Sequence, residues 1–276
     1  MDALEIRARL QVPAFASIAA SLSRLRFDRW PTHDEITSLA AGVATSRGRP
    51  VRFVAPRDHT ERERRYYELH IAATGEIETR GENWHDLFNA LAWISFPRAK
   101  AAINAQHAAI LEERGEAESR RRSPERDALT VFDEGGVVVA SSSPAVFSRI
   151  VDFEWKELFW HRRAEFEAST RVLAFGHALH EKALEPYIGM VAKTIFFPVD
   201  ARFLALDIEA QVGRVDEFLA LHFADRANFA NARTMAPMPV LGLPGWHPST
   251  SIESFYDDQA HFRKPKPRPE PDKMHG

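Results

Sequence analysis

The most informative stretch of the sequence lies at residues 83–93 and reads Asn-Trp-His-Asp-Leu-Phe-Asn-Ala-Leu-Ala-Trp. Its large apolar residues, together with Ile94, recur at intervals of three and four, which predicts a helix with one buried face. Asn83 stands where an N-cap residue is expected. His85 and Asn89 are four positions apart and therefore share a side of this helix. Because polar groups are costly to bury without partners, the stretch marks either a functional site or a buried hydrogen-bonded junction.

Helical patterns surround this stretch. Pro97 predicts a break, followed by a second helix over about residues 98–116. Residues 1–48 predict short helices joined by loops. Residues 153–185 predict two helices, which are either split around Gly176 or continuous through it.

Two segments carry hairpin signals. Residues 129–132 and 137–140 are apolar runs separated by Asp-Glu-Gly-Gly, which is the clearest hairpin pattern in the chain. Residues 66–80 predict either a hairpin with Gly75 in its turn or a helix end followed by a short strand. Residues 195–199 predict a short strand or a helical turn.

These elements predict an α+β fold that is mainly α, a single helical domain with one or two small β-hairpins and a proline-rich C-terminal tail. We expect residues 1–48 to form an N-terminal helical segment that packs on a main domain at residues 49–262. Prolines dominate from Met235 onward, and residues 263–276 are expected to be disordered.

Composition limits the classes of function. The chain has 276 residues and a formal net charge of −3, so no global basic field favours nucleic acid as a partner. The absence of cysteine excludes disulfides, thiolate catalysis and Cys-ligated zinc. No signal-peptide pattern and no apolar run of about 18 residues is found, so we expect no membrane partner. These features are compatible with a cytoplasmic protein that binds a small molecule.

Two clusters of polar residues have metal-ligating chemistry. In the first, His85 and Asp86 are adjacent, and Asn89 follows one helical turn after the histidine. In the second, His177 and Glu181 are four residues apart, which places them at chelating distance on one side of a helix. The alternative for both clusters is structural, with a capped helix start, a hydrogen-bonded histidine or a solvated ion pair.

Further candidates repeat these residue types. His180 follows the second cluster's histidine by three positions, and Glu157 and His161 have the same four-residue spacing. Asp133 and Glu134 lie in the predicted hairpin turn. Turn chemistry alone accounts for an Asp before Gly-Gly, but a rigid hairpin could also deliver a carboxylate to a nearby site.

The longest of these motifs resembles a known family. The chain is similar to the bacterial proteins grouped as domain of unknown function 3025, over roughly residues 50–262. The likeness rests on residues 79–80, 83–91 and 96–100, with shorter motifs at 132–136, 158–160, 175–179 and 244–246. The resemblance implies a bacterial soluble protein and supplies no established reaction.

A looser likeness is to the His-Me finger nucleases. Asn83 opens a helix after a potential hairpin, and His107 lies beyond it. Such nucleases need a general-base histidine near the end of the first hairpin strand, for which His70 is the nearest candidate. The absence of a basic composition argues against this analogy.

We therefore predict a metal-dependent hydrolase that binds a divalent metal ion. The predicted metal ligands are His85, His177 and Glu181, and the predicted catalytic residues are Asp86, Asn89 and Glu134. In this scheme a carboxylate orients a ligand histidine or acts as general base, and the amide positions substrate. The competing hypothesis is a non-catalytic ligand-binding or interaction protein, in which the same residues form a buried structural network.

Overall fold

The computed structural model describes residues 8–61, 63 and 66–263, and it is mainly helical with two small sheets. The α-helices are α2 (Ala19–Ser23), α3 (His33–Leu39), α5 (Tyr67–Thr74), α6 (Trp84–Ser95), α7 (Pro97–Arg120), α8 (Pro124–Gly135), α9 (Pro144–Val151), α10 (Arg163–Ser169), α11 (His177–Leu184), α12 (Ala201–Leu204) and α13 (Ile208–Ala224). The strands are β1 (Arg52–Val54), β2 (Glu76–Glu78), β3 (Gly136–Ser141), β4 (Thr170–Ala174), β5 (Val191–Pro198) and β6 (Ala236–Pro239). Shorter helical turns are η1 (Pro13–Ile18), the π-helical η2 (Glu157–His161), η3 (Arg226–Phe229), η4 (Ala232–Thr234), η5 (Val240–Gly242), η6 (Pro248–Ser251) and η7 (Glu253–Asp257).

Helix α6 forms as the sequence predicts. The side chain of Asn83 caps it by accepting a hydrogen bond of 3.0 Å from the backbone N–H of Asp86. The helix ends at Ser95, and Pro97 occupies the first turn of α7, where the missing N–H would have no partner in the helix. The predicted break between two helices is therefore confirmed.

The four-stranded sheet has the order β4-β3-β5-β6, with β3 antiparallel to β4 and parallel to β5. Every residue of β3 is buried. Side chains alternate between the two faces of a strand, and Val137 and Val139 belong to one hydrophobic cluster while Val138 and Ala140 belong to another. Both faces of this sheet are therefore covered, and the continuous apolar run marks its central strand.

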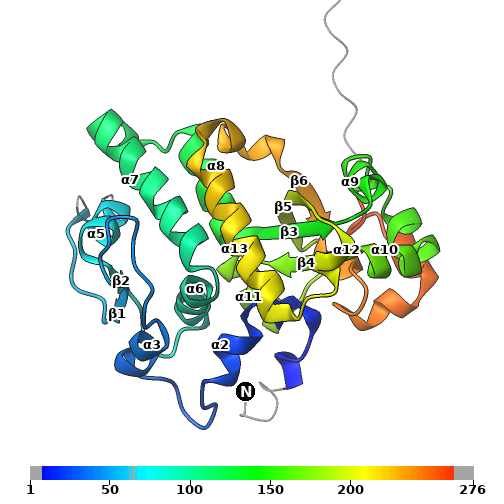
Figure 1. Ribbon diagram of the computed structural model, residues 1–276, viewed down its shortest axis with the longest axis horizontal. Helices are drawn as coiled ribbons and strands as arrows, with labels where there is room; N and C mark the ends of the chain where they lie inside the picture. The colour runs from blue at the N-terminus through cyan, green and yellow to red at the C-terminus, as the bar shows by residue number, and fades with distance from the viewer. Residues whose placement is uncertain (1–7, 62, 64–65, 264–276) are drawn as a thin grey trace, which may run out of the picture.

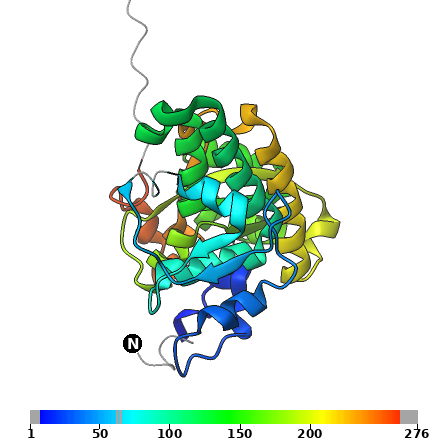
Figure 2. The same ribbon diagram turned by 90° about the vertical axis from the view of Figure 1, so that its left-hand side faces the viewer.

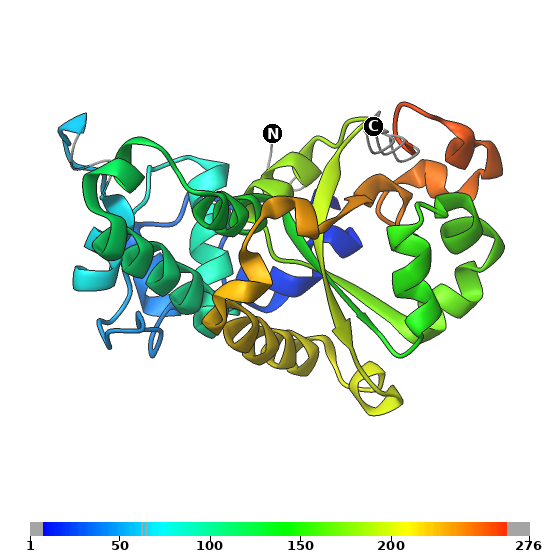
Figure 3. The same cartoon turned by 90° about the horizontal axis from the view of Figure 1, so that it is seen from above.

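Helices from distant parts of the chain form the two covering layers (Figure 1). Phe132 of α8 and Leu219 of α13 share the cluster that contains Val138. Phe15 of η1 and Phe88 of α6 share the other cluster. Figure 2 turns the small sheet of β1 and β2 toward the viewer, and in Figure 3 the green helices that follow β3 lie at the opposite end of the molecule.

The hairpin predicted over residues 129–140 is wrong. Residues 129–132 lie in α8, which begins at Pro124 after the N-cap Ser123, and β3 starts directly after the helix. The apolar residues of α8, among them Ala128 and Phe132, are buried against the sheet. Tertiary packing thus overrides the local turn signal, and the Ser-Pro helix start was the sequence cue for the correct structure.

Residues 66–80 adopt the second of their two predicted conformations. Helix α5 ends at Gly75, whose φ of 75° suits glycine, and β2 follows. β2 pairs with β1 in parallel, so no hairpin is formed here. Because His70 lies in α5 and the strands are parallel, the likeness to His-Me finger nucleases is wrong.

The prediction of two helices over residues 153–185 is wrong in its middle. Strand β4 lies between α10 and α11 and pairs with β3. Its β-branched residues Thr170 and Val172 were the only local strand signal. The split at Gly176 is confirmed, because this glycine is the N-cap of α11.

The α+β, mainly α fold class is confirmed. Phe15 and Ile18 of the predicted N-terminal segment share a hydrophobic cluster with the rest of the molecule, while the domain boundary near residue 48 stays a prediction. Apart from residue 263, the predicted disordered tail lies outside the described residues. Within the described part of the chain, none of the helices has the length and apolar character that crossing a membrane requires.

A close backbone contact at Gly176 gives a test of the fold. A Cβ at this position would lie 2.4 Å from the main-chain oxygen of Glu134, so Gly176→Ala must push α11 away from the end of α8. We expect a loss of about 1–3 kcal/mol in unfolding free energy, measured by urea denaturation. Gly213→Ala is the matched control, because a Cβ there meets nothing within 4 Å and the helix gains up to about 1 kcal/mol. Equal effects of the two substitutions would contradict this packing.

Candidate metal centre

Three helix ends meet at one place in the molecule. His85 lies in the first turn of α6, Glu134 in the last turn of α8, and His177 begins α11. Gly176 allows the third of these helices to start directly against the main chain of Glu134. Side chains from positions 85, 134 and 177, far apart in the sequence, are therefore brought together by rigid elements.

The potential metal-ligating atoms of these three side chains converge. Nε2 of His177 lies 3.2 Å from Nε2 of His85 and 3.6 Å from Oε2 of Glu134. Nε2 of His85 lies 4.0 Å from the same carboxylate oxygen. Two ligands of a tetrahedral ion with bonds of 2.0–2.1 Å are about 3.3 Å apart. Only small side-chain movements would place all three atoms around one divalent cation, and the three residues form a potential metal-binding group.

Glu181 orients the first histidine. Its Oε2 lies 2.9 Å from Nδ1 of His85. An ionised carboxylate only accepts hydrogen bonds, so Nδ1 of His85 is the donor in this contact. Nε2 of His85 makes the hydrogen bond of 3.2 Å with Nε2 of His177, and an ion bound between the two rings would displace the proton that these nitrogens share. A carboxylate behind a ligand histidine is the usual arrangement at protein metal sites.

His177 is held in its neutral form. Its side chain is 5% exposed, and burial lowers the pKa of its imidazole to about 3, against the opposing effect of the Asp133 charge. Nδ1 of His177 lies 3.8 Å from Oδ2 of Asp133. A neutral imidazole is the form that binds metal ions.

The pKa of the Glu134 carboxyl group is raised, whereas that of the His177 imidazole is lowered. Burial raises the pKa of Glu134, the nearby Asp133 charge adds to this, and the neighbouring His85 opposes it. The side chain still keeps 43% of its surface exposed. A cation bound here would favour the ionised form and could also be reached by solvent.

Sequence reasoning missed Lys100, which joins the candidates Asn89 and Asp133 beside the centre. Nζ of Lys100 lies 2.6 Å from Oδ1 of Asp133 and 2.9 Å from Oδ1 of Asn89. Asn89 was predicted to contact substrate, but its oxygen accepts from this lysine. Lys100 had no signal of its own, because a lysine in a helical pattern usually points to solvent.

Asp86 is bound by Arg80 and makes no hydrogen bond to His85 or His177 among the described residues. Its carboxylate accepts hydrogen bonds of 2.7 Å from the backbone N–H and of 2.9 Å from Nε and from Nη2 of Arg80. Although burial acts to raise it, these bonds hold the pKa of the Asp86 carboxyl below its usual value. The predicted catalytic role of Asp86 stays a prediction, and its contacts favour a structural role.

The remaining histidine candidates lie elsewhere. Glu157 pairs with Arg162 at 2.7 Å, and His161 is exposed in η2. His180 is fully buried beside the rings of Phe15 and Phe88, and burial lowers its pKa to about 4. The alternative of an ion pair on a helix surface thus fits the region of Glu157, and that of a core histidine fits His180.

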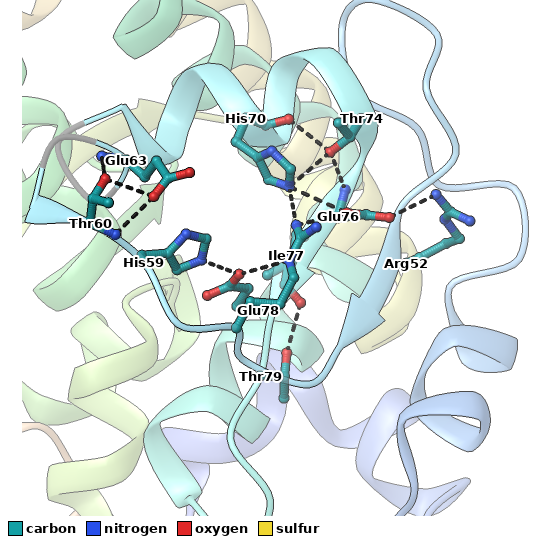
Figure 4. A network of polar contacts seen from close by, with 11 residues as sticks. Arg52, His59, Thr60, Glu63, His70, Thr74, Glu76, Ile77, Glu78 and Thr79 are labelled. Atoms are coloured by element: carbon teal, nitrogen blue, oxygen red, sulfur yellow. Dashed lines mark hydrogen bonds and ion pairs between the residues drawn. The ribbon is translucent and has the colours of Figure 1, made fainter.

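A second polar cluster lies beside β2 (Figure 4). His59 contacts Glu78, and Nε2 of His70 lies 3.3 Å from Oε2 of Glu76. The guanidinium of Arg57 pairs with both glutamates, at 3.0 Å and 3.6 Å. Because a fixed cation already neutralises these carboxylates, the cluster is an ion-pair network rather than a metal site.

Comparison with known proteins agrees with the sequence resemblance. The family model described as a protein of unknown function (DUF3025) matches residues 51–266. The chain belongs to the DUF3025 family. Comparison with curated proteins and with solved structures gave no match. The matched range includes the three helix ends that form the candidate metal centre.

Two of the buried histidines, His177 and His180, predict a loss of stability in weak acid. In the unfolded chain they titrate near pH 6.5, whereas in the folded protein His177 and His180 stay neutral down to about pH 3 and 4. The unfolded state therefore binds more protons below pH 6.5, and the free energy of unfolding falls as the pH falls. At pH 5 the loss is about 2 kcal/mol for each histidine.

Urea denaturation of the metal-free protein between pH 7 and pH 5 measures this effect. His180→Phe should give a shallower dependence, because it removes one titrating group from an aromatic environment. An unfolding free energy that is constant over this range would contradict the assignment of neutral buried rings.

Proposed function

We propose that this protein binds one divalent metal ion through His85, His177 and Glu134 and uses it in hydrolysis. The observation that carries the proposal is the convergence of three ligand atoms from three helix ends within 4.8 Å of one another. Two imidazoles and one carboxylate are a ligand set of catalytic zinc sites, which leave a further position for water. A bound ion of this kind lowers the pKa of its water toward about 7.

The contacts favour a change in two of the predicted roles. Glu134 replaces Glu181 as the third ligand, because its Oε2 faces both histidines. Glu181 then acts behind His85, fixing the ring so that Nε2 is available. The partial exposure of Glu134 also lets its second oxygen accept a proton from water at the same place.

The ligand-binding alternative shares part of this evidence. Asn89, Lys100 and Asp133 form a satisfied polar group that could serve only to fix the helix packing. A small molecule as the partner, a bacterial origin and a cytoplasmic location also stay predictions from the sequence.

Metal binding is the first test. Protein without a polyhistidine tag is stripped with chelator and titrated with Zn²⁺, Mn²⁺ and Fe²⁺ in a calorimeter. We expect one site, an increase in melting temperature on binding, and loss of the site in His177→Ala. His161→Ala is the matched control, since this exposed histidine lies outside the cluster and its removal should leave the affinity unchanged. Equal metal affinity of the wild type and His177→Ala would contradict the proposal.

Hydrolysis is the second test. Ester, amide and phosphoester substrates are screened with chelated and reloaded protein. We expect turnover that returns with the metal and falls by at least about 100-fold in Glu134→Gln, because a ligand of the ion is lost. Tight metal binding without turnover of any class would favour the non-catalytic alternative.

A further inference from the structure

Lys100 is buried to a degree that is unusual for its type. Its side chain is 4% exposed, and its ammonium group lies 5.5 Å from the centre of the Trp93 ring. An ammonium removed from water loses a large hydration energy, which only close partners can offset. Its two oxygen partners are Asp133 and Asn89.

Asp133 connects this lysine to the candidate metal centre. One carboxylate oxygen, Oδ1, accepts from Lys100 at 2.6 Å. The other, Oδ2, lies 3.8 Å from Nδ1 of His177. That nitrogen is buried and makes no hydrogen bond of good geometry among the described residues. A weaker contact of the ring with the main chain of Asp133 also acts to raise the pKa of His177. A shift of about 0.8 Å would bring Nδ1 to hydrogen-bond distance of the carboxylate.

We propose that Lys100 is a positioning residue for the metal centre, acting through Asp133. By occupying one carboxylate oxygen it fixes the other toward His177, so that the ring carries its proton on Nδ1 and offers Nε2 to the ion. This inference rests on the proposed metal-binding function, and it assigns that site a buried cation behind its second histidine.

The two histidines are then supported in the same way from opposite sides. Glu181 accepts from Nδ1 of His85 on one side, and Asp133 faces Nδ1 of His177 on the other. The Asp133 side chain is 21% exposed and is paired with a cation, whereas the Glu181 side chain is 43% exposed and better hydrated. If Lys100 were purely structural, its partner Asp133 would not also need to face the potential metal ligand His177.

The substitution Asp133→Asn distinguishes a positioning role of Lys100 from a purely structural one. Lys100 is a donor only, so it requires the oxygen of the new side-chain amide. The amide nitrogen must then face Nδ1 of His177, where it forces that atom to act as the acceptor. The proton of the ring moves to Nε2, which can no longer bind a metal ion. The shape of the side chain hardly changes.

In the double variant Lys100→Met/Asp133→Asn, we expect the proton of the His177 ring to return from Nε2 to Nδ1. Without the ammonium group the amide is free to turn, with its nitrogen toward Asn89 and its oxygen toward His177. The Nδ1 proton returns, although a buried charge pair has been lost. A second substitution thus restores what the first removed, which a structural role would not produce.

Nitrogen-15 NMR of the imidazole rings in metal-free protein tests this directly. We expect the Nδ1–H tautomer of His177 in the wild type, the Nε2–H tautomer in Asp133→Asn, and Nδ1–H again in the double variant. An unchanged tautomer in Asp133→Asn would overturn the proposal. So would a double variant that matches the single variant. The single substitution is nearly isosteric, so its spectrum alone decides the case if the double variant does not fold.

Zinc titration supplies the functional readout. We expect the dissociation constant to rise by about 10–100-fold in Asp133→Asn and to recover in part in the double variant. Arg126→Met is the matched control, because it breaks another buried contact between α7 and α8, with His107 at 3.2 Å, without touching the centre. It should lower stability and leave zinc affinity unchanged. A wild type that shows the predicted tautomers but binds no metal would count against the proposed function and not against the positioning of His177.

Discussion

The approach of α11 to the end of α8 is the constraint on which the centre depends. Gly176 lies so close to the main chain of Glu134 that no side chain fits between them. This contact places His177 opposite Glu134, and α6, which shares the hydrophobic cluster of α11, adds His85. Helix termini are rigid and their first and last turns are open to ligands, so they can hold a metal site with little reorganisation.

The chemistry follows from where each group lies in relation to solvent. His177 is buried and neutral, His85 is partly exposed, and Glu134 reaches water. Solvent therefore reaches this cluster from the side of Glu134 and not from the side of His177. A carboxylate lies behind each histidine, and Asp133, the one behind His177, is paired with Lys100. The polar groups that were costly to bury are thus connected to one another.

Much of this was predictable from local patterns. The apolar spacing over residues 83–93 and the cap at Asn83 gave α6 correctly, and residue type alone pointed to His85, His177, Glu134 and Glu181. The pairing of residues some ninety positions apart rested on chemistry rather than on any sequence signal. Glu134 was found for a wrong structural reason, since it was expected in a hairpin turn and lies at a helix end.

The failures have a common physical cause. Burial of one face against the sheet, at Ala128, Leu129 and Phe132, made the apolar run before Asp133 a helix, although its local composition favours a strand. The role of Lys100 could not be predicted, because only the tertiary structure shows that its neighbours are a carboxylate and an amide. The sequence likewise gave no sign that Arg80 binds the carboxylate of Asp86, whose catalytic role stays a prediction. Sequence spacing locates residues on an element but does not show which partner each one meets.

The most direct test of the central claim is anomalous diffraction from crystals soaked with zinc, with data collected on both sides of the zinc absorption edge. The account predicts a peak about 2 Å from Nε2 of both His85 and His177 and from an oxygen of Glu134. A peak only at other residues, such as His59 and Glu78, or no peak in zinc-saturated crystals, would contradict it.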